Sequence, residues 1–150
     1  MTTLSANLHR ASAMAFAAFL AASVSAADIG QIKVSNGQVT VERKGESRPG
    51  IVGTRLESSD VVRTGAAGSV GITMADNSLL SAGPNSVLSL DRFDFDPTSD
   101  QGRFDAQLQK GSLAVISGRI AKQSPESMTV RTPSTILGVR GTEFAVAAND

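Results

Sequence analysis

The chain has 150 residues and a formal net charge of zero, and it contains no Cys, Trp or Tyr. Its single histidine is His9, so thiol and imidazole groups are missing from the rest of the sequence. These absences exclude disulfides, Cys or His metal sites and Cys or His nucleophiles beyond the first residues. Neutral charge argues against nucleic-acid binding, and without Trp and Tyr few rings can stack on bases. We therefore expect no enzyme activity, no cofactor and no metal.

Residues 1–27 are predicted to be a cleaved signal peptide. A polar segment ends at Arg10, an apolar run covers residues 11–22, and small residues precede Ala26 and Ala27. This order is typical of secretory signals. The apolar run is too short to span a bilayer, which needs roughly 20 residues, although an uncleaved anchor is the alternative. Cleavage after Ala26 or Ala27 predicts a periplasmic or secreted chain without a transmembrane span.

Residues 28–150 are predicted to form one all-β domain of many short strands. Apolar and polar residues alternate with a period of two, which is typical of half-buried strands. The alternation covers residues 32–34, 39–41, 70–74, 87–95, 104–108, 113–117, 128–132, 136–139 and 144–146. Short strands must stack to bury a core, so we predict a solenoid-like domain, with a sandwich-like arrangement as the alternative.

Turn sequences separate these segments at intervals of about ten residues. They are Asn36-Gly37, Lys44-Gly45, Asp76-Asn77, Gly83-Pro84-Asn85, Lys110-Gly111 and Ser117-Gly118, and residues 97–102 and 122–127 are the most loop-like stretches. Gly37, Gly68 and Gly111 each begin the pattern glycine, polar, apolar, any residue, apolar. Either this is the form of any strand led by a glycine, or each glycine marks the corner of a repeating β-solenoid.

Two charged stretches have simple structural interpretations. The first contains Asp91, Asp94, Asp96, Asp100 and Asp105. Ca²⁺ prefers six to eight oxygen ligands, but this spacing is not that of a calcium-binding loop. Alternation with Phe93 and Phe95 instead predicts that Asp94 and Asp96 face solvent. The second stretch places Arg43, Lys44 and Arg48 among glutamates, which predicts a solvated hairpin.

The most distinctive segment is VRTPSTILGVRGTEFAV, residues 130–146. Pro133 is expected to end a strand because it has no N–H to donate. Gly138 and Gly141 flank Val139-Arg140 and suggest two tight corners. Arg140 either pairs internally with Glu143 or is presented to a partner. The candidate partner-binding or structural motif comprises Thr132, Pro133, Gly138, Val139, Arg140, Gly141, Thr142 and Phe144.

Five blocks of sequence, in order, resemble the FecR-type domain. They are GQVTVERKG from Gly37, SSDVVRTGAAGSVGITMADNSLLSAGPNSVLSL from Ser58, DFD from Asp94, KGSLAVISGRIAK from Lys110 and TPSTILGVRGTEFAV from Thr132. The resemblance covers about residues 37–146. This domain is the periplasmic part of FecR-like sensors, which couple outer-membrane ferric-siderophore receptors to a cytoplasmic sigma factor.

The resemblance implies a β-rich, solenoid-like periplasmic domain that works by protein–protein contact. The full regulators also carry a sigma-binding segment, a transmembrane helix and a further carboxyl-terminal domain. Here a predicted signal peptide stands in place of the first two, so the chain resembles the secreted, stand-alone form. We expect an exported protein-binding or signalling domain whose partner is a membrane receptor or a second copy. The alternative is a structural or scaffold module of a cell-envelope or secreted assembly.

Overall fold

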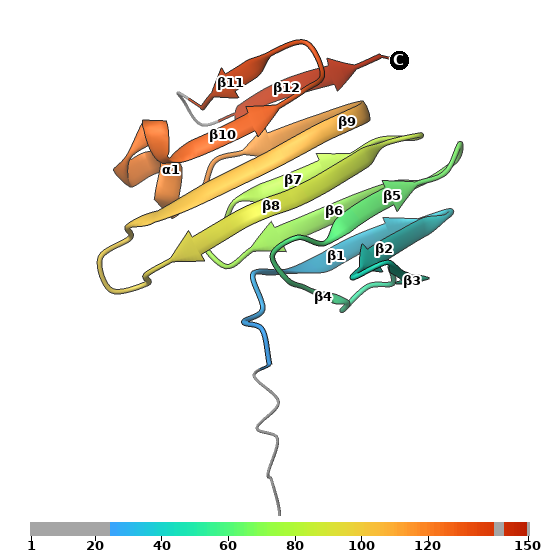
Figure 1. Ribbon diagram of the computed structural model, residues 1–150, viewed down its shortest axis with the longest axis horizontal. Coiled ribbons are helices and arrows are strands. Elements are labelled where there is room, and N and C mark those ends of the chain that lie inside the picture. Colours follow the sequence, from blue (N-terminus) through green and yellow to red (C-terminus); the bar gives the residue numbers. More distant parts are fainter. Residues whose placement is uncertain (1–24, 140–142, 150) are drawn as a thin grey trace, which may run out of the picture.

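The computed structural model describes residues 25–139 and 143–149, which form strands and two short helices (Figure 1). The strands are β1 (Gly30–Asn36), β2 (Val39–Arg43), β3 (Glu46–Pro49), β4 (Arg55–Leu56), β5 (Val61–Thr64), β6 (Ser69–Met74), β7 (Leu79–Ala82), β8 (Val87–Phe95), β9 (Gly102–Ile116), β10 (Met128–Arg131), β11 (Ile136–Gly138) and β12 (Glu143–Ala148). Helix α1 covers Arg119–Gln123, and a 3₁₀ turn, η1, covers Pro125–Ser127. The all-β prediction is confirmed.

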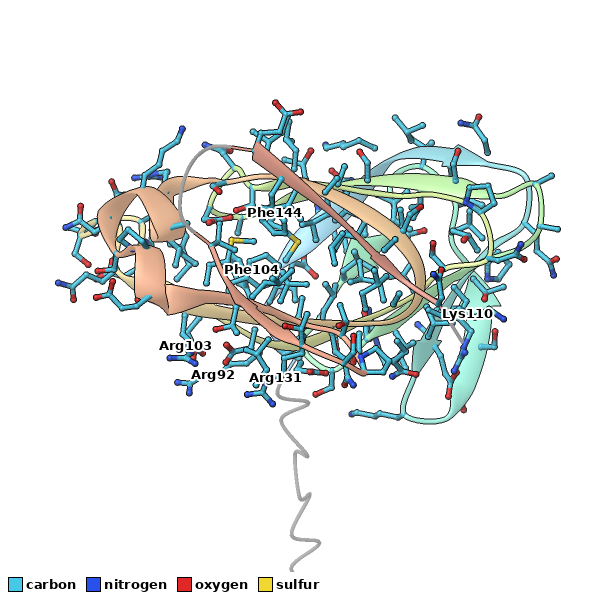
Figure 2. The ribbon with its side chains drawn as sticks, turned by 90° about the horizontal axis from the view of Figure 1, so that it is seen from above. Arg92, Arg103, Phe104, Lys110, Arg131 and Phe144 are labelled. Atoms are coloured by element: carbon cyan, nitrogen blue, oxygen red, sulfur yellow. The ribbon has the colours of Figure 1, made fainter. Side chains whose placement is uncertain are left out.

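The strands form a curled sheet with two facing layers, and β9 belongs to both (Figures 1 and 2). Layer A has the strand order β4-β1-β6-β7-β9-β12. Layer B has the order β3-β2-β5-β8-β9-β10-β11. Neighbouring strands are antiparallel except for β10 and β9, which are parallel. The choice between a solenoid-like and a sandwich-like description stays a prediction.

The hydrophobic core lies between the layers. Burial alternates along β6, with Val70, Ile72 and Met74 pointing inward. Phe104 is fully buried, and its ring meets that of Phe93 edge-on at a centroid distance of 5.2 Å. Figure 2 shows Phe104 between the layers. Burial of one such side chain contributes about 1.5–3 kcal/mol, so the inward positions of both layers stabilise the fold.

The three glycines of the repeated pattern lie where the chain passes from one layer to the other. Gly37 precedes β2, Gly68 precedes β6, and Gly111 lies where β9 leaves layer B for layer A. Gly37 and Gly111 have φ values of +63° and +92°, which favour glycine. A Cβ on Gly68 would lie 2.5 Å from the carbonyl oxygen of Gln38, so this corner excludes a side chain by close approach. These three glycines therefore lie at corners between the layers, and whether the corners belong to a repeating solenoid stays a prediction.

Hydrogen bonds join successive corners. The N–H of Gly65 donates to the carbonyl of Gln38 over 2.9 Å, and the N–H of Asn85 donates to the carbonyl of Gly65 over 3.0 Å. The Thr64 hydroxyl donates to the carbonyl of Gly83 over 2.6 Å. Further along, the N–H of Ser112 donates to the Ser86 hydroxyl over 3.0 Å. The corners thus stack directly on one another.

The sequence prediction differs from the structure at several elements. Strands β3, β4, β5 and β7 and helix α1 were not predicted from alternation, and the predicted turn at Lys110-Gly111 lies inside the continuous strand β9. The turns at Lys44-Gly45 and Asp76-Asn77 are confirmed, because Lys44, Gly45 and Asn77 all have positive φ. The predicted loop at residues 97–102 joins β8 to β9, which begins at Gly102.

Candidate functional site

Two outer strands meet at the carboxyl-terminal end of the fold. Strand β11 is the last strand of layer B and pairs with β10, and β12 is the last strand of layer A and pairs with β9 (Figure 1). Within the described ranges, each has another strand on one side only. An edge strand exposes backbone N–H and C=O groups that another chain can pair with. This end can therefore accept an extended segment.

A small apolar hollow lies between these two strands. It has a volume of about 190 Å³ and is lined by Leu137, Gly138, Val139, Phe144 and Ala145. Val139 is buried, and its N–H donates to the carbonyl of Met128 over 3.1 Å. Phe144 is half-buried and packs against the core, and Figure 2 shows it between the layers. We call this hollow and its two flanking strands the open end.

The turn before β11 positions the lining residues. Thr132 is buried, and its hydroxyl accepts a hydrogen bond from the N–H of Thr135 over 3.1 Å. The N–H of Thr132 donates to the carbonyl of Thr135 over 2.8 Å. Pro133 lies in this turn after β10 ends, as predicted. The register then sets Leu137 opposite Val130, so both point toward the core.

The structure brings five of the eight predicted site residues to the open end: Thr132, Pro133, Gly138, Val139 and Phe144. Arg140, Gly141 and Thr142 lie outside the described residues, so the pairing of Arg140 with Glu143 stays a prediction. The tight corner expected at Gly138 is wrong. Its φ is not positive, and a Cβ there would meet nothing within 4 Å, because β11 is an outer strand with open space beside it.

The outer face of layer B carries charges that pair with each other. Arg92 and Asp94 form an ion pair of 2.6 Å, and Arg103 and Asp105 one of 3.0 Å. Figure 2 shows Arg92, Arg103 and Arg131 on the same side of the molecule. Burial acts to raise the pKa of Asp105, but the Arg103 and Thr129 hydrogen bonds and the charges of Arg103 and Arg131 together lower it below its ordinary value.

The remaining carboxylates of the acidic stretch serve local structure. Asp94 and Asp96 are exposed, as predicted. Asp96 accepts hydrogen bonds from the N–H of Thr98 over 2.9 Å and the hydroxyl of Ser99 over 3.0 Å. These hydrogen bonds lower the pKa of Asp96 below its ordinary value, and the bond from the Thr98 N–H has the largest effect. Among the residues that the structure describes, no three His, Cys, Asp or Glu side chains gather in a way that could hold a metal ion.

The hairpin of β2 and β3 is less solvated than its sequence predicts. Arg43 is half-buried and binds the fully buried carboxylate of Asp60 with two hydrogen bonds of 2.8 and 2.7 Å. It also pairs with Glu57 over 2.7 Å. Hydrogen bonding to Asp60 raises the pKa of Arg43 above its ordinary value, although burial opposes this. The solvated interpretation of Arg43 is therefore wrong, because its partners come from the β4–β5 connection.

These features define an all-β domain with open strand edges and a charged outer face whose ions are largely paired. A comparison with family profiles identifies it further. The profile described as FecR protein matches residues 60–150, and the chain belongs to this family. The match begins later than the resemblance suggested, so β1–β4 precede it. No curated protein and no solved structure matches the chain.

Within residues 25–139 and 143–149, neither α1 nor η1 has the length and apolar character needed to cross a bilayer.

Proposed function

We propose that this chain is an exported, non-enzymatic domain that binds another protein at its open end. It would act in the periplasm or outside the cell, in the manner of the periplasmic part of FecR-like regulators. The observation that carries the proposal is the meeting of two unpaired strand edges around an apolar hollow in the described structure. Membership of the FecR family supports a regulatory role.

Binding would use strand addition. Strand β12 offers six residues for backbone pairing and β11 only three, so β12 is the better template for a partner's extended segment. An apolar side chain of that segment would enter the hollow beside Leu137 and Phe144. Backbone hydrogen bonds would supply affinity, and the shape of the hollow would supply selectivity. Thr132, Pro133, Gly138 and Val139 would form the rim of this site.

Export rests on the amino-terminal sequence. The apolar run of residues 11–22 and the small residues before Ala26 and Ala27 have the pattern of a signal peptide. We infer that residues 1–27 are removed and that 28–150 act as one domain. Mass spectrometry of the protein from a periplasmic fraction tests this, because the processed chain should begin at Ala27 or Asp28.

A photo-crosslinking residue in place of Ile136 tests binding at the open end in living cells. Ile136 is 68% exposed and lies on the edge strand β11. The matched control is Val52, which is 60% exposed but lies between β3 and β4, far from the open end along both layers. We expect an adduct of defined mass from position 136 and none from position 52.

The nature of the adduct separates the two candidate functions. Crosslinking to a membrane receptor supports the signalling role, whereas crosslinking to a cell-wall or secreted structural component supports the scaffold alternative. Equal adducts from positions 136 and 52, or none from position 136, would overturn binding at the open end.

A further inference from the structure

The outer face of layer A differs in chemistry from that of layer B. Strand register aligns its outward residues in rows that cross five strands. One row is Val34, Gly71, Ser81, Ala114 and Ala145. The next row is Gln31, Thr73, Leu79, Ile116 and Glu143. Among these ten positions only Glu143 is charged, whereas layer B presents paired arginines and aspartates at its surface. Arg55 of β4 extends the second row beyond Gln31 and forms an ion pair with Asp28.

Large apolar side chains stand exposed on this face. Val34, Leu79 and Ile116 are 50%, 42% and 43% exposed. Between them the residues are small, and a shallow hollow of about 490 Å³ lies over β7, β9 and β12. Isolated exposed apolar residues are ordinary, but Leu79 and Ile116 are register neighbours and stand beside small residues, which favours an interaction surface.

Charges occur at the two lateral edges of the face. Beside β1, Arg55 and Asp28 pair with each other, which leaves Lys33 as the cation of that edge, and the other edge carries an anion. Lys33 on β1 donates a hydrogen bond of 2.5 Å to the side chain of Gln31. Glu143 on β12 lies at the other end of the same row as Gln31. The strands of the face follow the order β1-β6-β7-β9-β12, so β7 is the central strand.

We propose that a second copy of this chain covers the outer face of layer A, related by a twofold axis that runs parallel to the strands over β7. Such an axis keeps each row over itself and reverses the strand order, so β1 of one copy lies over β12 of the other. Lys33 and Gln31 of each copy then face Glu143 of the other copy, so the dimer contains this contact twice. An axis perpendicular to the strands would instead set β1 over β1 and β12 over β12, which brings like charges to the same edge.

The same axis matches large residues with smaller ones. Val34 of one copy lies over Ala145 of the other, and Ile116 lies over Thr73. Sheets that pack face to face adopt an angle of about 30° because of their twist, and interdigitate side chains in this way. Charge and size therefore favour the same arrangement.

The area sets the strength of association. Five strands spaced about 4.8 Å apart and six residues of about 3.3 Å give a footprint of roughly 480 Å² per copy. The total of roughly 1,000 Å² is near the lower limit of specific interfaces. We therefore expect a dimer that forms and dissociates with concentration. The inference does not depend on the proposed function, because the face extends over β1, β6, β7 and β9 as well, although the two surfaces share Ala145 of β12.

Sedimentation velocity of the processed chain across a range of concentrations tests the proposal. The wild type should pass from monomer to dimer below about 1 mM. Ala114→Arg places a charge in the middle of the face and should abolish the dimer. The matched control is Gln109→Arg, an exposed position on the part of β9 that belongs to layer B, which should dimerise as the wild type does.

A charge exchange tests the axis. Glu143→Lys should raise the dimer dissociation constant at least tenfold, and Lys33→Glu combined with Glu143→Lys should restore it to within about threefold. Circular dichroism of each variant confirms that it folds. A wild type that remains monomeric, a dimer insensitive to Ala114→Arg, or a double variant no tighter than Glu143→Lys alone would overturn the proposal.

Discussion

The ion pair of Arg43 with Asp60 yields the sharpest test of what holds layer B to the β4–β5 connection. Asp60 is fully buried, and its carboxylate receives two bonds from Arg43 and one of 2.8 Å from the N–H of Glu57. Replacing Arg43 with Met keeps an apolar stem but leaves a buried carboxylate without its cation. Breaking a buried pair in this way costs about 3–5 kcal/mol.

Arg63→Met is the matched control. Arg63 pairs with Glu42 over 3.2 Å, but their side chains are 48% and 39% exposed, so the loss should stay within about 1 kcal/mol. For a domain of this size, the Arg43→Met cost corresponds to a fall in Tm of roughly 10 °C or more. Urea unfolding followed by circular dichroism supplies the free energies.

A double variant separates the charge from the packing. Arg43→Met with Asp60→Asn removes both charges while the Asn oxygen can still accept the Glu57 N–H. Most of the loss seen in Arg43→Met should then be recovered. Equal destabilisation by Arg43→Met and Arg63→Met, or no recovery in the double variant, would refute the view that the unpaired carboxylate is the source of the cost.

Two further predictions concern the corners and the charged face. Gly111→Ala should destabilise the fold far more than Gly45→Ala, although both glycines have positive φ. A Cβ on Gly111 would lie 2.5 Å from Ser86 Cα, whereas a Cβ on Gly45 would meet nothing within 4 Å. Gly45→Ala should therefore cost only the backbone strain of about 1–2 kcal/mol. Comparable losses in urea titrations would contradict the stacking of corners. The pKa of Asp105 is lower in the folded state than in the unfolded state. Its charge therefore stabilises the wild type above the unfolded-state pKa, and this stabilisation is lost as the pH falls through the folded-state pKa. Asp105→Asn should flatten this acid-induced loss of stability below about pH 4. An unchanged pH profile would show that the Arg103 and Arg131 surroundings contribute nothing.

Sequence reasoning found the strands that carry their own signal and missed those that depend on neighbours. Strands β6 and β8 alternate apolar and polar residues and were predicted within a residue. Strand β3, with the sequence ESRP, is exposed throughout and has no apolar residue, so only its pairing with β2 defines it. Strand β4 is two residues long. Local pattern cannot predict an element whose hydrogen bonds come from another segment.

Helix α1 also depends on a distant segment, here through buried polar contacts, so local sequence does not predict it. It has five residues, and Gly118 at its N-cap makes no side-chain cap bond. Its start is instead held by Asp76, whose carboxylate accepts the N–H of Ile120 over 3.2 Å and whose carbonyl accepts the N–H of Arg119 over 2.8 Å. A capping residue 44 positions away in sequence leaves no local signal at the helix.

The candidate site was predicted as a segment but not as an open end. The sequence of residues 130–146 contains the TPST turn and the apolar residues around it, and from this segment alone we predicted a partner-binding or structural motif. Whether a strand lies at the edge of a sheet is a property of topology, which residue patterns do not contain. The paired rows of layer A were likewise invisible, since they require the register of five strands.

Strand β12 allows the two proposed surfaces to be tested apart, because alternate residues of a strand point to opposite faces. Phe144 and Val146 pack toward the core at the open end, whereas Ala145 and Ala147 are exposed on the outer face. Ala147 lines the hollow on the outer face of layer A and not that of the open end. Ala147→Arg should therefore weaken the dimer and leave the crosslink from position 136 intact. Phe144→Ser should weaken the crosslink and leave dimerisation within about threefold of the wild type. If either substitution reduced both signals equally in a folded protein, β12 would serve a single surface, and the separation of edge from face would have to be abandoned.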